Sequence, residues 1–211
     1  MNRTRGAFLD MAVSAAELVE RTEVAERWDE PGASLGMTVG AVASHLVGSG
    51  IEMPLRALHG EDPPGERALD PSRFFSGQTL DLDHEQHRQV RDRALDAAGR
   101  GVAFWRAAAR SALDELAPRL VDEPETRRVV VLERFHMRLD DLLVTRLVEL
   151  IAHSDDLAAS IEVPTPDPPA DAVDIFSACL VNVARRRHGD IAVVRALSRG
   201  DRAPAGVFPV F

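Results

Sequence analysis

Apolar residues recur at steps of three and four along most of this chain, which is the spacing of one face of an α-helix. The pattern predicts helices over residues 4–28, about 83–119, 139–161, 170–187 and 190–199. Thr38 is a favourable N-cap for one more helix, which is expected to fade around residues 48–50 and to resume over residues 53–59. These segments together predict an all-α protein.

Proline and glycine mark the breaks between the predicted helices. Residues 60–80 hold three prolines and three glycines and predict a long loop, and the proline-rich segment 162–171 separates two of the later helices. Gly99 and Gly101 form a soft point inside the long helix. The β-branched residues 129–132 are either one strand-like segment or a lead-in to a helix.

The alternation of long helices with loops, without any repeat of fixed period, is typical of a helix bundle. The sequence therefore predicts a single domain over residues 1–211, with the apolar tail at residues 203–211 packed back on the bundle.

Charge and composition narrow the classes of function. Acidic residues outnumber basic ones, 34 to 25, and the net charge of −9 argues against non-specific binding to nucleic acid or to an anionic membrane. Acidic residues interrupt the apolar positions of the N-terminal segment, which excludes a signal peptide, and no uncharged apolar run is long enough to span a membrane. We therefore expect a cytoplasmic protein. The sequence leaves a monomer and a homodimer both open.

Cys179 is the only cysteine, so an intrachain disulfide and a cysteine-rich zinc module are excluded. It lies among apolar residues of a predicted helix, where a free cysteine usually acts as a small hydrophobic residue. No base is adjacent to it in the sequence, and we do not predict it to be a nucleophile.

The candidate functional site begins with a carboxylate and an imidazole four residues apart on one predicted helix. Glu149 and His153 share a helix face, one turn from each other, and can both bind one metal ion. His45 lies within the apolar pattern of another helix and is the candidate third ligand. Isolated histidines are more often surface or hydrogen-bonded core residues, so spacing alone leaves both interpretations open.

The neighbouring polar residues also have both a functional and a purely structural interpretation. Asp156, one turn beyond His153, is either an acceptor for a ligand histidine, a contact for a cofactor or an ordinary surface residue. Arg146 either neutralises Glu149, binds an anionic substrate or forms a surface ion pair. His84 and His87 are three residues apart among acidic residues, and we favour a solvated helix start over a second metal site.

Two stretches resemble the mycothiol-dependent maleylpyruvate isomerase family, whose members are related to the DinB-like four-helix bundles that bind metal. WDEPGASLGMTVGAVASHLVG is similar to the family's second-helix signature, in which a Trp and a short loop precede a Thr-Val-Gly helix start and a ligand His. LDDLLVTRLVELIAHSDDLA resembles its Arg–Glu–His–Asp helix. A weaker likeness covers VNVARRRHGDIAVVRALSRG.

The resemblance implies a DinB-like four-helix bundle with extra C-terminal helices. It also implies that His45, Glu149 and His153 bind the metal, expected to be zinc or another divalent ion such as nickel, and that Asp156 and Arg146 contact the cofactor. Three protein ligands leave a coordination position open, as catalytic zinc requires. In the family that position is thought to take the thiol of mycothiol, and the metal then favours the thiolate.

The predicted function is therefore a zinc-dependent transferase or isomerase, in which a metal-bound thiolate, with mycothiol as the first candidate, attacks a small electrophile. The alternative is a non-catalytic metal-binding bundle with a ligand-binding or regulatory role, since the chain ends at about its sixth helix without a further substrate domain. The expected partners are a small-molecule thiol and an electrophile, and neither nucleic acid nor a membrane.

Overall fold

The computed structural model describes residues 1–63, 68–77, 84–133 and 135–210, and most of these residues are helical. This agrees with the predicted all-α class, apart from one small antiparallel sheet in which β1 (Arg128–Val131) pairs with β2 (Phe135–Arg138). Of the two interpretations of residues 129–132, the strand-like one is therefore correct.

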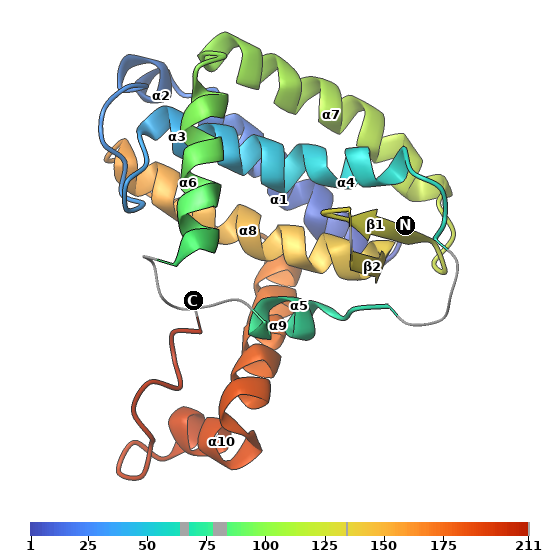
Figure 1. Ribbon diagram of the computed structural model, residues 1–211, viewed down its shortest axis with the longest axis vertical. Helices are drawn as coiled ribbons and strands as arrows, with labels where there is room; N and C mark the ends of the chain where they lie inside the picture. Colours follow the sequence, from blue (N-terminus) through green and yellow to red (C-terminus); the bar gives the residue numbers. More distant parts are fainter. Residues whose placement is uncertain (64–67, 78–83, 134, 211) are drawn as a thin grey trace.

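Two long helices and a composite rod form the body of the molecule (Figure 1). α8 (Leu139–Ser160) packs against α1 (Arg3–Val19) and also against the rod formed by α3 (Val39–His45), η1 (Leu46–Ile51) and α4 (Glu52–Leu58). The rod and α8 run in opposite directions and lie side by side, which agrees with the adjacency that the candidate ligands require. α7 (Val102–Asp122) covers α1 and α4 from the other side.

The region of residues 48–50 differs from the sequence prediction. The helix does not fade there but continues as the π-helix η1 directly into α4. The physical reason is close packing, since a Cβ atom on Gly50 would lie 2.6 Å from Leu150 Cδ2 of α8. Glycine thus lets the rod approach α8, and the sequence signal that suggested a break reflects this tertiary contact.

The predicted long helix over residues 83–119 is wrong in its middle, and its expected start at residue 83 lies outside the described residues. It is divided into α6 (Glu85–Ala98) and α7, because Gly101 adopts a φ of +81° and the chain turns. Two indoles satisfy the last carbonyls of α6: Trp105 Nε1 donates to Ala97 O at 2.9 Å, and Trp28 Nε1 donates to Ala98 O at 3.2 Å.

Two further corrections concern the N-terminal half. The predicted helix over residues 4–28 is two helices, α1 and α2 (Thr22–Glu26), because Arg21 is extended and the turn places Val24 in the core. The predicted loop at residues 60–80 contains α5 (Pro71–Ser76), which Asp70 caps by accepting from Arg73 N.

The C-terminal helices begin and end close to where the sequence placed them. α8, α9 (Ala170–His188) and α10 (Asp190–Ser198) agree with their predicted bounds to within one residue. The tail packs back as expected, since Val207 and Val210 are buried. They belong to a second apolar cluster, separate from the main core, that contains Phe75, Val148, Cys179, Val183, Ala184, Val193, Val207 and Val210.

Residues 183–210 form a narrow extension below the body, which we call the arm (Figure 1). The arm consists of the end of α9, α10 and the tail. Within the described residues, no helix is long and apolar enough to cross a membrane.

Candidate metal centre

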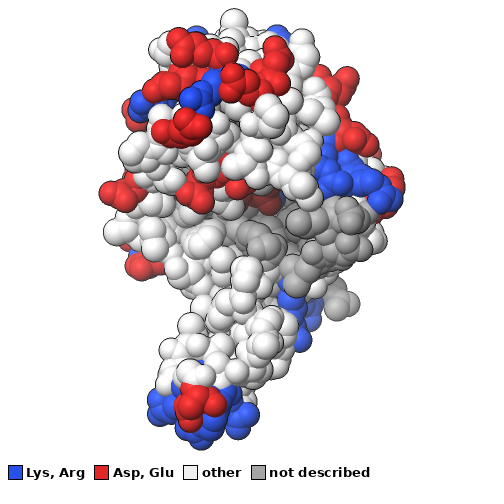
Figure 2. Space-filling view, turned by 90° about the vertical axis from the view of Figure 1, so that its left-hand side faces the viewer, with Lys and Arg blue, Asp and Glu red and all other residues white. Residues whose placement is uncertain are grey.

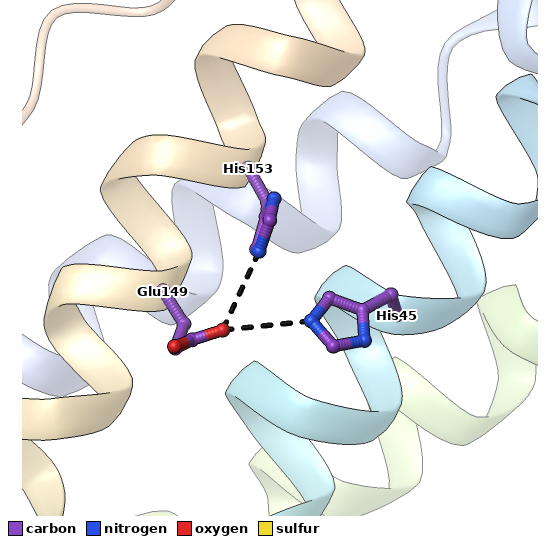
Figure 3. A group of neighbouring side chains, drawn as sticks. All are labelled: His45, Glu149 and His153. Atoms are coloured by element: carbon purple, nitrogen blue, oxygen red, sulfur yellow. Dashed lines mark ion pairs between the residues drawn. The ribbon is translucent and has the colours of Figure 1, made fainter. Parts of the chain in front are cut away.

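His45, Glu149 and His153 come together where the end of α3 meets the middle of α8 (Figure 3). His45 is the last residue of α3, whose start is fixed by Thr38, because the Thr38 hydroxyl oxygen accepts from Ala41 N at 3.1 Å. Glu149 and His153 are one turn apart on α8. Two well-defined helices therefore hold all three side chains.

The three side chains point toward a common centre. His45 Nε2 lies 3.5 Å and His153 Nε2 lies 3.4 Å from the same oxygen, Glu149 Oε2. The two imidazole rings are nearly perpendicular, with centroids 4.7 Å apart. One potential ligand atom from each residue lies within 4.8 Å of the others, so the group could hold a divalent ion. It is the one such group found among the described residues.

The three side chains are mostly buried but remain partly exposed to solvent. The side chains of His45, Glu149 and His153 are 17%, 19% and 24% exposed. Part of each side chain therefore reaches the surface, while most of the site is out of water.

Asp156 lies beside the centre and contacts a ligand histidine. His153 Nδ1 donates to Asp156 Oδ2 at 2.9 Å, and Ser34 Oγ donates to the same oxygen at 2.8 Å. A carboxylate on one ring nitrogen fixes the orientation of the imidazole and leaves the other nitrogen free to bind metal. Of the three roles weighed for Asp156, its position fits the acceptor role best.

Arg146 is buried beneath Glu149, with only 3% of its side chain exposed. Its guanidinium donates to Ser49 Oγ at 2.8 Å and to Ser49 O at 3.2 Å, and it lies 4.0 Å from Glu149 Oε1. The surface ion pair considered from the sequence is excluded by this burial. Arg146 instead connects the carboxylate on α8 to the π-helix that follows His45.

These contacts determine the charge states in the metal-free site. Burial alone would raise the pKa of Glu149, but hydrogen bonds from His153 and His45 and the charge of Arg146 hold that pKa well below its usual range. Burial would lower the pKa of His153, but its hydrogen bonds to Asp156 and Glu149 raise it to about 9. Glu149 is thus an ionised carboxylate at neutral pH, ready to bind a cation.

Two residues of the site were not predicted from the sequence. Ser49 is one helical turn after His45, and this spacing is a signal that could have found it. Ser34 is 122 residues away from Asp156, and no local pattern connects them.

The other candidates lie elsewhere. His84 is an exposed N-cap whose Nδ1 accepts from Gln86 N, which agrees with a solvated helix start. Cys179 is 6% exposed, and burial raises its pKa to about 12, which agrees with a structural role. A pocket of about 730 Å³ between α5, α8 and α9 is lined in part by Asp70, Cys179 and Arg186, and it shares no lining residue with the metal group.

No protein-family model, curated protein or solved structure matches this chain.

Proposed function

We propose that this protein is a metal-dependent enzyme, a transferase or isomerase that uses a small thiol to attack an electrophile. The observation that carries the proposal is the convergence of His45, Glu149 and His153 in a partly exposed site. In this proposal the ion is zinc, or another divalent ion such as nickel, and mycothiol is the first candidate thiol. A cytoplasmic location belongs to the same proposal.

The donor set fits a catalytic ion better than a structural one. Two imidazoles and one carboxylate are ligands that zinc accepts, and three protein ligands leave a position for a substrate. Asp156, the acidic group nearest to the three along α8, is engaged with His153 Nδ1 and does not complete the set. When bound, the ion would stabilise the deprotonated form of a thiol near neutral pH.

The thiol chemistry needs no further reactant. When the thiol adds to an electrophilic double bond, a sulfur–carbon bond forms and the proton of the thiol is transferred to the neighbouring carbon. An isomerase later breaks the same bond and regenerates the thiol, whereas a transferase releases the adduct.

The remaining polar residues act in this proposal through the ligands. Asp156 holds the ring of His153, and Arg146 holds Glu149 and the turn at Ser49. Both are positioning residues. Asp156 has a side chain that is 35% exposed, so it is also the better placed of the two to contact a bound thiol cofactor.

Cobalt substitution tests the proposal directly. A thiol that coordinates Co²⁺ gives a charge-transfer band in the near ultraviolet. We expect the cobalt-loaded protein to develop this band when mycothiol is added, and Glu149→Gln to load little cobalt and show no band. His188→Ala, which changes an exposed histidine far along the chain, is the control and should behave like the wild type.

The outcomes separate the two candidate functions. Cobalt loading with no spectral response to any thiol would contradict the thiol chemistry and leave the non-catalytic metal-binding bundle. Failure of the wild type to bind any divalent ion would contradict both.

A further inference from the structure

The arm and the rest of the molecule carry opposite charge. Residues 183–202 contain six arginines and two aspartates, although the whole chain has a net charge of −9. The acidic excess therefore lies in the body. In Figure 2 basic residues gather at the tip of the narrow lower end, around a few acidic ones, and acidic residues with a few basic ones among them cover the upper part of the molecule.

The acidic end is a shallow surface depression where α1 passes into α2. Four glutamates line it, together with Arg21 and Thr22: Glu17, Glu20, Glu23 and Glu26. Glu20 and Glu23 form ion pairs with neighbouring arginines, whereas Glu17 and Glu26 are exposed outside those pairs. Val13, one turn before Glu17 on α1, is 45% exposed, so this end also presents an apolar side chain to solvent.

The basic end also presents an apolar stripe. Ile191, Val194 and Leu197 follow each other at steps of three along α10 and are 62%, 56% and 62% exposed. Val193, on the other side of the helix, is buried in the second apolar cluster. Arg195 and Arg199 flank the stripe. Large apolar side chains exposed together beside charged ones are typical of an interaction surface.

We propose that the arm docks on a second copy of this chain, and that two copies lie antiparallel with each arm against the acidic end of the other. The charge separation favours this partner, because each molecule carries both complementary surfaces. A two-fold axis perpendicular to the long axis brings both pairs of surfaces together at once and closes the assembly. The inference does not depend on the metal centre.

The proposed contact combines two forces. Ion pairs between the arm's arginines and the glutamates orient the two copies, and salt weakens such exposed interactions. Burial of the stripe against the region of Val13 adds an apolar contribution. Because both contacts form twice in the closed pair, substitutions on the arm act twice.

Sedimentation at several protein and salt concentrations is the first test. We expect a dimer whose dissociation constant rises at least about tenfold between roughly 0.05 and 0.5 M salt, because the paired charges are exposed. Arg195→Glu with Arg199→Glu should be monomeric at concentrations where the wild type is dimeric. The control, Arg128→Glu with Arg138→Glu, makes the same change in charge on the small sheet, away from both ends, and should remain dimeric.

Charge exchange identifies the receiving surface. Glu17→Arg with Glu26→Arg should also be monomeric, because both ends are then basic. Mixing this variant with the arm variant should restore dimers. In the mixed pair the two introduced glutamates of one arm face the two introduced arginines of the other copy, and the second arm and the second acidic end are those of the wild type. A mixture that stays monomeric would overturn the proposed pairing. A wild-type protein that is monomeric at all concentrations, or that binds vesicles of anionic lipid through the arm instead, would overturn the proposal as a whole.

Discussion

Glu149 is the residue on which the candidate metal centre depends most. Its Oε2 atom faces both histidines and its Oε1 atom faces Arg146, so it connects α3, α8 and the π-helix. The carboxylate is ionised at neutral pH because these groups lower its pKa against the effect of burial. A cation bound between the histidines would therefore meet a fixed negative charge.

Removal of a ligand gives the simplest prediction at this scale. We expect His153→Ala to lower the bound metal to roughly a tenth or less of the wild-type content while helix content is retained, because apolar burial and not the ion stabilises the bundle. Elemental analysis and far-ultraviolet circular dichroism measure the two quantities. Unchanged metal content would exclude His153 as a ligand, and complete unfolding would mark the ion as structural.

Asp156→Asn should have a smaller and more specific effect. Loss of the carboxylate on His153 Nδ1 is expected to weaken metal binding about 10–100-fold, the usual effect of such a partner. The matched control is Asp155→Asn, since Asp155 is exposed and hydrogen-bonds to Thr165 instead. Chelator competition measures both affinities. Equal affinities for the two variants would refute the positioning role of Asp156.

The raised pKa of His153 predicts how metal binding depends on pH. With a pKa of about 9, His153 is protonated at pH 7 in the metal-free protein, and an ion must displace that proton. Affinity should therefore rise with pH up to about 9 and fall toward acid, by up to about tenfold per pH unit for one proton. The stability of the metal-free protein depends on pH in the opposite sense. The contribution of the His153 proton to the free energy of unfolding is complete below pH 6.5, the pKa of the unfolded histidine, and is lost as the pH rises through 9. Titrations at pH 6, 7 and 8 would contradict this if affinity were constant.

At the scale of elements, close packing between helices decides the shape of the site. The rod α3–η1–α4 reaches α8 because Gly50 lies against Leu150, and it reaches the N-terminal region because Gly40 lies against Trp28. A Cβ atom on Gly40 would lie 2.5 Å from Trp28 Cε2. The Trp28 indole is held in turn by Ala98 O, so it has little freedom to move.

Gly40→Ala should therefore destabilise the fold. Overpacking of this kind costs about 1–3 kcal/mol, reduced by roughly 1 kcal/mol because alanine favours a helix more than glycine does. The control is Gly200→Ala, where an added Cβ would meet nothing within 4 Å, and its effect should stay within about 0.5 kcal/mol. Urea unfolding of both variants makes the comparison. A Gly40→Ala protein as stable as Gly200→Ala would show that Trp28 can move aside.

At the scale of the whole molecule, a metal ion would join two helices that already pack without it. The apolar core runs through α1, α3, α7 and α8 and does not depend on the site. An ion that binds only the folded state still adds stability, by about 2.7 kcal/mol at a concentration 100 times its dissociation constant.

For a chain of this length, that gain corresponds to roughly 5–10 °C in melting temperature. We expect zinc to produce this rise in the wild type and not in Glu149→Gln, measured by differential scanning calorimetry. A chelator should return the wild type to its metal-free melting temperature without unfolding it. Unfolding by the chelator at room temperature would contradict the independence of the core from the metal.

The sequence by itself determined the features that depend on neighbouring residues. The bounds of α8, α9 and α10 follow from periodicity and from the proline and glycine between them, and the start of α3 follows from the capping hydroxyl of Thr38. Helical geometry alone placed Glu149 and His153 on one face. These are local properties, because backbone hydrogen bonds and caps join residues only a few positions apart.

Only the tertiary structure decided the features that depend on contacts between distant segments. It brought His45 to Glu149, buried Arg146 under that carboxylate, and joined Ser34 to Asp156 across the chain. It also turned the apparent break at Gly50 into a π-helix and the soft point at Gly101 into a turn between two helices. The physical reason is common to all of these: glycine permits both a break and a close approach, and a charged side chain permits both exposure and burial. At Gly50 the deciding neighbour is Leu150, and at Arg146 it is Ser49. At the turn around Gly101 the indoles of Trp28 and Trp105 hold the carbonyls of Ala98 and Ala97.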